Sequence, residues 1–331
     1  MALAAAQLGT FGTANAQSNP PASPNAPPPP NDVSFGALKQ IDAGVLNVGY
    51  AEIGPATGPA VILLHGWPYD IHSYVEVAPL LAAAGYRAIV PYLRGYGTTR
   101  LLSDSTFRNA QQSVVALDVV ALMDALKIDK AVLAGFDWGA RTADIVAALW
   151  PQRCIALVSV SGYLITSLAA NLQPLPPAAE LGWWYQYYFA IRRGAIGYAE
   201  HRYDFNKLIW KIVSPKWNFD DATFDRTAAA FNNPDHVAIV IHNYRWRLSL
   251  AKGDPKYDDL EQTLFAGPTI AVPTITIASD FDGAAAAGTA YAGKFSGKYS
   301  HRILDGIGHN VPQEAPHAFA DAVIAAARSA G

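Results

Sequence analysis

The stretch Ala131-Val132-Leu133-Ala134-Gly135-Phe136-Asp137-Trp138-Gly139 decides the fold that we predict for this chain of 331 residues. Its first four residues are apolar and predict a buried strand, and residues 140–150 predict the helix that follows. Glycines two positions before and after Asp137 let the chain turn sharply between the two elements. This strand, turn and helix form the setting in which a nucleophile is presented at the end of a sheet strand.

The residue at the centre of the turn narrows the chemistry. A serine would need a base to remove its proton, whereas a carboxylate with an ordinary pKa of about 3.9 is already an anion at neutral pH. Attack of Asp137 on an ester would give a reactive anhydride. Attack on a saturated carbon with a leaving group gives a stable alkyl ester, and epoxides and alkyl halides are such substrates. The alternative is that Asp137 only caps the helix.

Two later segments supply partners in the order nucleophile, acid, histidine. Apolar strands run into the loops Ser279-Asp280-Phe281-Asp282-Gly283 and Gly306-Ile307-Gly308-His309-Asn310. We expect His309 to activate the water that cleaves the ester, and Asp282 to orient and stabilise the imidazole. Asp280 is the alternative acid. Asp282-Gly283 could instead be an ordinary turn, and His309 a solvated loop residue.

With His65-Gly66-Trp67-Pro68 after the apolar run 60–64, the chain resembles an α/β-hydrolase over about residues 44–327. It resembles the epoxide hydrolase branch, which is close to the haloalkane and fluoroacetate dehalogenases. The resemblance implies an α/β fold with a mostly parallel central sheet flanked by helices, an antiparallel strand pair near residues 44–53, and a helical cap inserted after the sixth strand. Alternating apolar strands and helical stretches agree with such a sheet.

The resemblance also implies an oxyanion hole. The His-Gly-x-Pro loop of the family carries a cis peptide, here Trp67–Pro68, and directs the backbone N–H of Trp67 at the oxyanion. The backbone N–H of Trp138 would be the second donor, and both tryptophans are expected to contact substrate. The turn that begins at Arg94 resembles an architectural motif of these enzymes.

The region of about a hundred residues before the strand at Thr274 is rich in Trp, Tyr, Arg and Asn. The resemblance implies that it is the cap and that Tyr185 and Tyr244 donate to the opening epoxide oxygen. Phenols with a pKa near 10 are protonated at neutral pH. The alternative is that these tyrosines belong to an aromatic stripe that packs the cap onto the core.

Arg141, four residues after Asp137, resembles a substrate-binding arginine of the fluoroacetate dehalogenases. On a helix it lies one turn from the nucleophile and could bind a substrate carboxylate. An ion pair with Asp144 is the alternative. The aromatic cap favours an apolar pocket, while Arg141, Arg245 and Arg247 leave room for an acidic substrate.

We therefore expect an epoxide hydrolase whose partners are a small-molecule epoxide, or a halogenated compound, and water. A haloalkane or haloacid dehalogenase with the same nucleophile is the first alternative, and a non-catalytic ligand-binding protein on this fold is the second. No cofactor or metal is implied by the histidine spacing, and a net charge of −3 without a basic run argues against nucleic acid. We expect no stable membrane insertion and leave a homodimer open.

The chain divides into four predicted parts. Residues 1–32 carry an Ala14-Asn15-Ala16 site typical of an export signal, followed by seven prolines in residues 19–31. Residues 33–162 and 266–331 would form the hydrolase core, and residues 163–265 the cap. We expect export to the bacterial periplasm, with a cytoplasmic location as the alternative; the single Cys154 fits either compartment.

Overall fold

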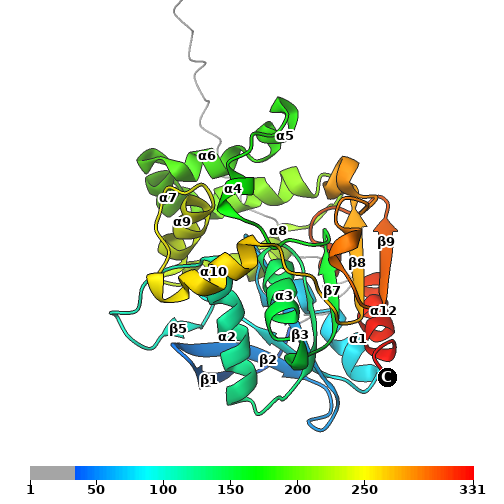
Figure 1. Cartoon of the computed structure of the whole chain (residues 1–331). Coiled ribbons are helices and arrows are strands. Elements are labelled where there is room, and N and C mark those ends of the chain that lie inside the picture. The colour runs from blue at the N-terminus through cyan, green and yellow to red at the C-terminus, as the bar shows by residue number, and fades with distance from the viewer. Residues whose placement is uncertain (1–33) are drawn as a thin grey trace, which may run out of the picture. The chain divides into compact units, whose positions relative to one another are not determined.

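Apolar strands form the centre of a nine-stranded sheet in the computed structural model, which describes residues 34–331 (Figure 1). All residues of the predicted strands at Ala60 and Ala131 are buried, as expected for strands covered on both faces. The strands are β1 (Lys39–Ala43), β2 (Leu46–Ile53), β3 (Ala60–Leu64), β4 (Arg87–Pro91), β5 (Arg100–Leu101), β6 (Ala131–Gly135), β7 (Cys154–Val160), β8 (Thr274–Ser279) and β9 (Tyr299–Leu304).

The strand order is β1-β2-β4-β3-β6-β7-β8-β9, and β5 pairs with β2. The pairs β1·β2, β2·β4 and β2·β5 are antiparallel, and every other pair is parallel. The predicted mostly parallel sheet is therefore confirmed. The short strand β5, which the sequence analysis did not predict, makes β7 the seventh strand along the chain.

Helices cover the two faces of this sheet. Helix α2 (Gln112–Ala125) packs against α3 (Trp138–Leu149), and α1 (Val77–Ala83) packs against α12 (Pro316–Arg328), which follows the short α11 (Val311–Glu314). Figure 1 shows α2 and α3 in front of the sheet and α1 and α12 on the side of β8 and β9. Because strands β3, β4 and β6 to β9 run parallel, their carboxyl ends all lie at one edge of the sheet, which these helices leave uncovered.

In the described structure, every regular element between β7 and β8 is a helix. These helices lie at the edge of the sheet where the parallel strands end (Figure 1). The longest, α7, spans 22 residues and has a kink at His201. The α-helices of this region are α4 (Leu168–Asn171), α5 (Pro177–Gly182), α6 (Trp184–Ala190), α7 (Arg192–Val213), α8 (Asp221–Ala228), α9 (His236–Arg247) and α10 (Asp258–Phe265).

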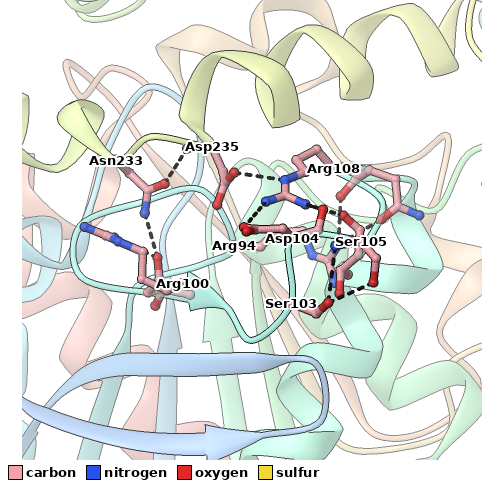
Figure 2. A network of polar contacts seen from close by, with 11 residues as sticks. Arg94, Arg100, Ser103, Asp104, Ser105, Arg108, Asn233 and Asp235 are labelled. Atoms are coloured by element: carbon pink, nitrogen blue, oxygen red, sulfur yellow. Dashed lines mark hydrogen bonds and ion pairs between the residues drawn. The ribbon is translucent and has the colours of Figure 1, made fainter.

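Polar contacts join the start of α9 to the loops around β5 (Figure 2). The Nε of Arg108 donates to Oδ1 of Asp235 at 3.0 Å, and Nδ2 of Asn233 donates to the carbonyl oxygen of Thr99 at 2.6 Å. The side chain of Asn233 also accepts the backbone N–H of Asp235. The N-terminal end of α9 is thereby fixed to the core.

Arg94 has the architectural role predicted for it. Its side chain is buried and pairs with both carboxylate oxygens of Asp118, at 2.6 and 2.7 Å, and it also donates to Asn109.

The predicted export signal and proline-rich linker lie outside the described residues.

Candidate active site

Asp137 occupies the turn between β6 and α3. Its φ of 54° and ψ of −125° are unusual for a residue with a side chain, and such a conformation costs about 1 to 3 kcal/mol. The flanking glycines explain how the turn fits. A Cβ atom at Gly139 would lie 1.8 Å from the carbonyl oxygen of Leu64, and one at Gly135 would lie 2.4 Å from the backbone of Gly139. The turn therefore raises Asp137 above the end of β6.

The parallel register brings a second loop beside this turn. Leu64, the last residue of β3, lies opposite Gly135 of β6, so the loop from His65 onward runs next to Asp137. The backbone N–H of Trp67 donates to Oδ1 of Asp137 at 2.8 Å. The Trp67–Pro68 peptide bond is cis, as the resemblance to the family implies. Trp138 begins α3, so its backbone N–H has no acceptor within the helix.

His309 approaches Asp137 from the loop after β9. Its Nε2 lies 3.4 Å from Oδ2 of Asp137, and its ring is nearly buried. Hydrogen bonds to other segments fix this loop. The backbone N–H of His309 donates to Oγ of Ser214, and the hydroxyl of Ser214 donates to Oε1 of Glu314 at 2.6 Å. Glu314 also accepts the backbone N–H of Gly308. Neither residue could be identified from the sequence, because no local pattern links them to His309. Ser214 directly follows α7 in the inserted region, and Glu314 lies in the short helix α11.

The two candidate acids differ in their surroundings. Asp282 lines the same cavity as His309 and Asp137, but its Oδ2 accepts the backbone N–H of Ser279 at 2.8 Å and does not bond His309. Asp280 is exposed, pairs with Lys216 at 2.6 Å and accepts the backbone N–H of Gly306. Within residues 34–331, Nδ1 of His309 is buried without a hydrogen-bond partner. Of the two candidate acids, only Asp282 therefore shares the cavity with the imidazole.

Phe281, between the two acids, packs on the imidazole with ring centroids 4.1 Å apart. Sequence analysis gave it no role. Phe136, next to the nucleophile, also contacts the imidazole, with centroids 5.9 Å apart. These rings restrict the positions that the imidazole can adopt beside Asp137.

The charge of Asp137 is stabilised by its neighbours. Burial raises the pKa of this carboxyl, but the hydrogen bond and charge of His309 and the N–H of Trp67 outweigh burial, so the net pKa is lowered. Asp137 is therefore anionic at neutral pH, as a nucleophile must be.

Tyr185 of α6 and Tyr244 of α9 meet above the nucleophile loop. Their ring centroids are 5.4 Å apart, and they lie 5.0 and 5.2 Å from the indole of Trp67. Burial, with a smaller effect of the charge on Asp137, raises the pKa of both phenols above the ordinary value of 10. Tyr244 lines the cavity, whereas Tyr185 is not a lining residue but contacts two of them, Trp183 and Tyr244. The phenols remain protonated at neutral pH.

A cavity of about 330 Å³ joins these groups. Asp137, His309, Asp282 and Tyr244 line it, together with Arg141 of α3 and Arg247 of α9. The alternative ion pair between Arg141 and Asp144 is not formed, because no oxygen of Asp144 lies within 4.0 Å of the guanidinium. Arg141 instead donates through Nε to the carbonyl oxygen of Leu164 at 3.1 Å.

Comparison with known proteins agrees with this geometry. A crystal structure of a protein from Klebsiella pneumoniae, described as a proposed epoxide hydrolase, is 61% identical and has a TM-score of 0.87. The match covers 90% of this chain and 100% of that one. This chain belongs to the epoxide hydrolase family. The family model described as the α/β hydrolase fold matches residues 59–192 of this chain.

Curated members of the epoxide hydrolase family are more distant. The epoxide hydrolase of Caballeronia sordidicola is 34% identical over 40% of this chain and 39% of its own length. Epoxide hydrolase B of Mycobacterium tuberculosis is 34% identical over 42% of each chain. The matches thus span about two fifths of the curated relatives.

Two kinds of feature are absent from the described residues. Among residues 34–331, no helix has the length and apolar character that a membrane span requires. In the same part of the chain, no three His, Cys, Asp or Glu side chains are grouped so as to hold a metal ion.

Proposed function

We propose that this protein hydrolyses epoxides to vicinal diols through a covalent ester on Asp137. The observation that carries the proposal is the carboxylate on the sharp turn, with His309 on one side and a buried pair of phenols on the other. Membership of the epoxide hydrolase family supports the same reaction.

The two oxygens of Asp137 are suited to different tasks in the first step. Oδ1 accepts the N–H of Trp67, so we assign the attack on a ring carbon of the epoxide to Oδ2, which lies 3.4 Å from Nε2 of His309. A carbon–oxygen bond of the ring breaks as the ester bond forms. Tyr244, with Tyr185 beside it, donates to the departing oxygen and supplies the proton that turns the alkoxide into a hydroxyl group.

The second step returns the enzyme to its starting state. His309 takes a proton from water, which attacks the carbonyl carbon of the ester. The developing charge falls on Oδ1, where Trp67 and Trp138 can donate their backbone N–H groups; loss of one such donor typically costs about 2.7 to 4 kcal/mol. The ester bond then breaks, protonated His309 gives its proton to the departing oxygen, and the proton of the new carboxyl group returns to the tyrosinate. The diol leaves, and the Asp137 carboxylate, the imidazole and the phenol are restored.

We assign Asp282 as the acid that supports His309. Asp282 lines the cavity beside His309, whose Nδ1 has no hydrogen-bond partner in the described chain. Asp280, in contrast, is engaged by Lys216 and Gly306. The assignment requires the Asp282 side chain to exchange the N–H of Ser279 for the imidazole.

One observation favours the dehalogenase alternative. Nε1 of Trp138 is buried without a partner in residues 34–331, and an indole N–H is a group that can bind a departing halide. The indole of Trp67 cannot assist, because its Nε1 donates to the hydroxyl of Tyr198 at 2.9 Å. A site with one free indole and two phenols is better suited to an opening epoxide.

The test is intact-protein mass spectrometry of His309→Gln, incubated with styrene oxide and, separately, with 1-bromobutane. The variant lacks the base for the second step, so we expect an adduct with the whole mass of styrene oxide that accumulates without turnover. A further Asp137→Asn substitution should abolish the adduct.

Each contrary outcome points to a named alternative. An alkyl adduct formed only from bromobutane, with release of bromide, would make the protein a dehalogenase. Reversible binding that Asp137→Asn leaves unchanged would favour the non-catalytic alternative. Full turnover by His309→Gln would overturn the role of His309.

We also propose export to the periplasm, on the basis of the Ala14-Asn15-Ala16 site and the uncharged residues around it. Fractionation of expressing bacterial cells, followed by immunoblotting, tests this location. A homodimer stays a prediction that light scattering can test.

A further inference from the structure

Two arginines share one cavity without a carboxylate partner. Arg141 and Arg247 both line the cavity that contains Asp137. Neither forms an ion pair within residues 34–331, and the Nε of Arg247 is buried without a hydrogen-bond partner there. The only hydrogen bond of the Arg141 side chain goes to a backbone carbonyl, that of Leu164. Both side chains are only partly exposed, and arginines withdrawn from solvent are usually paired, so this arrangement needs an explanation.

The two charges act on one another. Burial, followed by repulsion from Arg247, lowers the pKa of Arg141 to about 10. The guanidinium of Arg247 also lies 6.0 Å from the ring centre of Tyr244, which places it beside the phenol assigned to the epoxide oxygen. The cavity therefore presents two cationic side chains close to the groups that would open the ring.

The acids nearby do not neutralise this pair. Burial raises the pKa of Asp144 to about 8, so this carboxyl is largely protonated at neutral pH. Asp137 is the nucleophile and interacts with His309, and Asp282 forms no ion pair with either arginine. The remaining titratable groups of the lining are Tyr163, Tyr244 and His309, none of which supplies a negative charge at neutral pH.

Arg247 also marks an opening of the cavity. A second hollow of about 210 Å³ shares Trp183 and Arg247 with the cavity, and its other walls come from α4, α5 and α6. Glu180 also lines this second hollow, so Arg247 stands between a carboxylate on that side and Asp137 on the other.

We propose that the substrate is an epoxide that carries a carboxylate, which Arg141 and Arg247 bind together. This inference rests on the proposed function and deepens it by naming the substrate class. The planar fork of an arginine matches the two oxygens of a carboxylate, and two such forks fix both the position and the orientation of the substrate. The carboxylate also supplies the direct ion-pair partner that neither arginine has within residues 34–331.

The smallest such compound, oxirane-2-carboxylate (glycidate), illustrates the reaction. Oδ2 of Asp137 attacks a ring carbon, the carbon–oxygen bond breaks, and a tyrosine protonates the freed oxygen. Water activated by His309 then cleaves the ester, giving 2,3-dihydroxypropanoate and the free carboxylate of Asp137. The balance is one epoxide and one water for one diol, and the substrate carboxylate is unchanged throughout.

Binding can be tested apart from turnover in the Asp137→Asn variant, which keeps the arginines but cannot form the ester. Isothermal titration calorimetry would compare glycidate with glycidamide, its neutral analogue of nearly the same shape. We expect glycidate to bind about 10- to 100-fold more tightly, the range for charge-assisted hydrogen bonds. Adding Arg247→Gln should remove most of this difference, while Arg247→Lys should keep part of it.

The matched control is Arg193→Gln, which removes the same charge from an exposed position of the neighbouring helix α7. It should leave the preference for glycidate unchanged. Steady-state rates in the enzyme with its native Asp137 should show the same pattern, with Arg247→Gln lowering kcat/KM for glycidate by a much larger factor than for glycidamide or styrene oxide.

Two failures can be told apart. Hydrolysis of styrene oxide or glycidamide without any preference for glycidate would overturn the carboxylate site and leave the proposed function standing. No ester from any of the three epoxides in His309→Gln would overturn the proposed function, even if the arginines still bound glycidate in the calorimeter.

Discussion

The two phenols above Asp137 have a protonation state that the buried site fixes. Desolvation and the nearby carboxylate both disfavour a phenolate, so Tyr185 and Tyr244 keep their protons at neutral pH. Their proposed task is needed only in the first step, whereas His309 is needed only in the second. The two roles can therefore be separated kinetically.

Replacement of the phenols tests this division. We expect the double variant Tyr185→Phe with Tyr244→Phe to form the ester about 10² to 10⁴ times more slowly, the usual contribution of general acid catalysis. The rate of ester formation from styrene oxide, measured by stopped flow or quenched mass spectrometry, checks this. Tyr203→Phe, at an exposed position of α7, is the control. An unchanged rate in the double variant would assign both tyrosines to packing alone.

Helix α9 carries two functional groups on one face. Tyr244 and Arg247 are three residues apart, so they lie on the same side of the helix, and both line the cavity. The position of this face depends on the N-terminal end of α9, where Asp235 meets Arg108 and Asn233 meets the loop before β5 (Figure 2). The cap helix is thus attached to the core at its start, and a second attachment nearer Arg247 joins His242 and Asn243 to the backbone of Ala110.

We predict that Arg108→Gln loosens this attachment without unfolding the protein. Both side chains of the Arg108–Asp235 pair are partly exposed, so we expect a loss of less than about 1 kcal/mol in the free energy of unfolding. Amide hydrogen exchange at the start of α9 should nevertheless become faster. Urea denaturation and exchange mass spectrometry measure the two effects. Exchange at the start of α9 that stays at its original rate would mean that the Arg108–Asp235 pair does not fix the helix.

At the scale of the whole molecule, the buried Asp144 links stability to pH. Its pKa is raised mainly by burial, to about 8, while in the unfolded chain it has the ordinary value near 4. Between these values the unfolded state releases a proton that the folded state keeps. Stability therefore falls as pH rises through this window, in contrast to a carboxyl with a lowered pKa.

The Asp144→Asn variant should escape this dependence, because an amide oxygen can still accept the backbone N–H of Leu164. We expect the free energy of unfolding of the variant, relative to the original protein, to increase by up to about 1.4 kcal/mol per pH unit between pH 5 and 7. Urea denaturation at three pH values measures this difference. A difference that is the same at each pH would show that Asp144 is ionised in the folded protein.

Local patterns were sufficient for the framework of the fold. The apolar runs at Ala60, Ala131 and Thr274 predicted β3, β6 and β8, because strands buried on both faces must be apolar along their whole length. The turn around Asp137 was readable from the glycines on either side of it, although the contact that requires Gly139 comes from Leu64 of β3. The short strand β5 gave no such pattern, because it depends on pairing with β2.

The sequence by itself determined the fold class, the carboxylate at the strand end and the order of the groups around it, because these depend on residue type and short spacing. Only the tertiary structure decided which groups meet. Ser214 and Glu314 support His309 across a separation of about a hundred residues, and Arg247 joins Arg141 although α9 and α3 are far apart in the chain. Such contacts arise from the packing of the cap helices on the sheet edge, which no local pattern encodes.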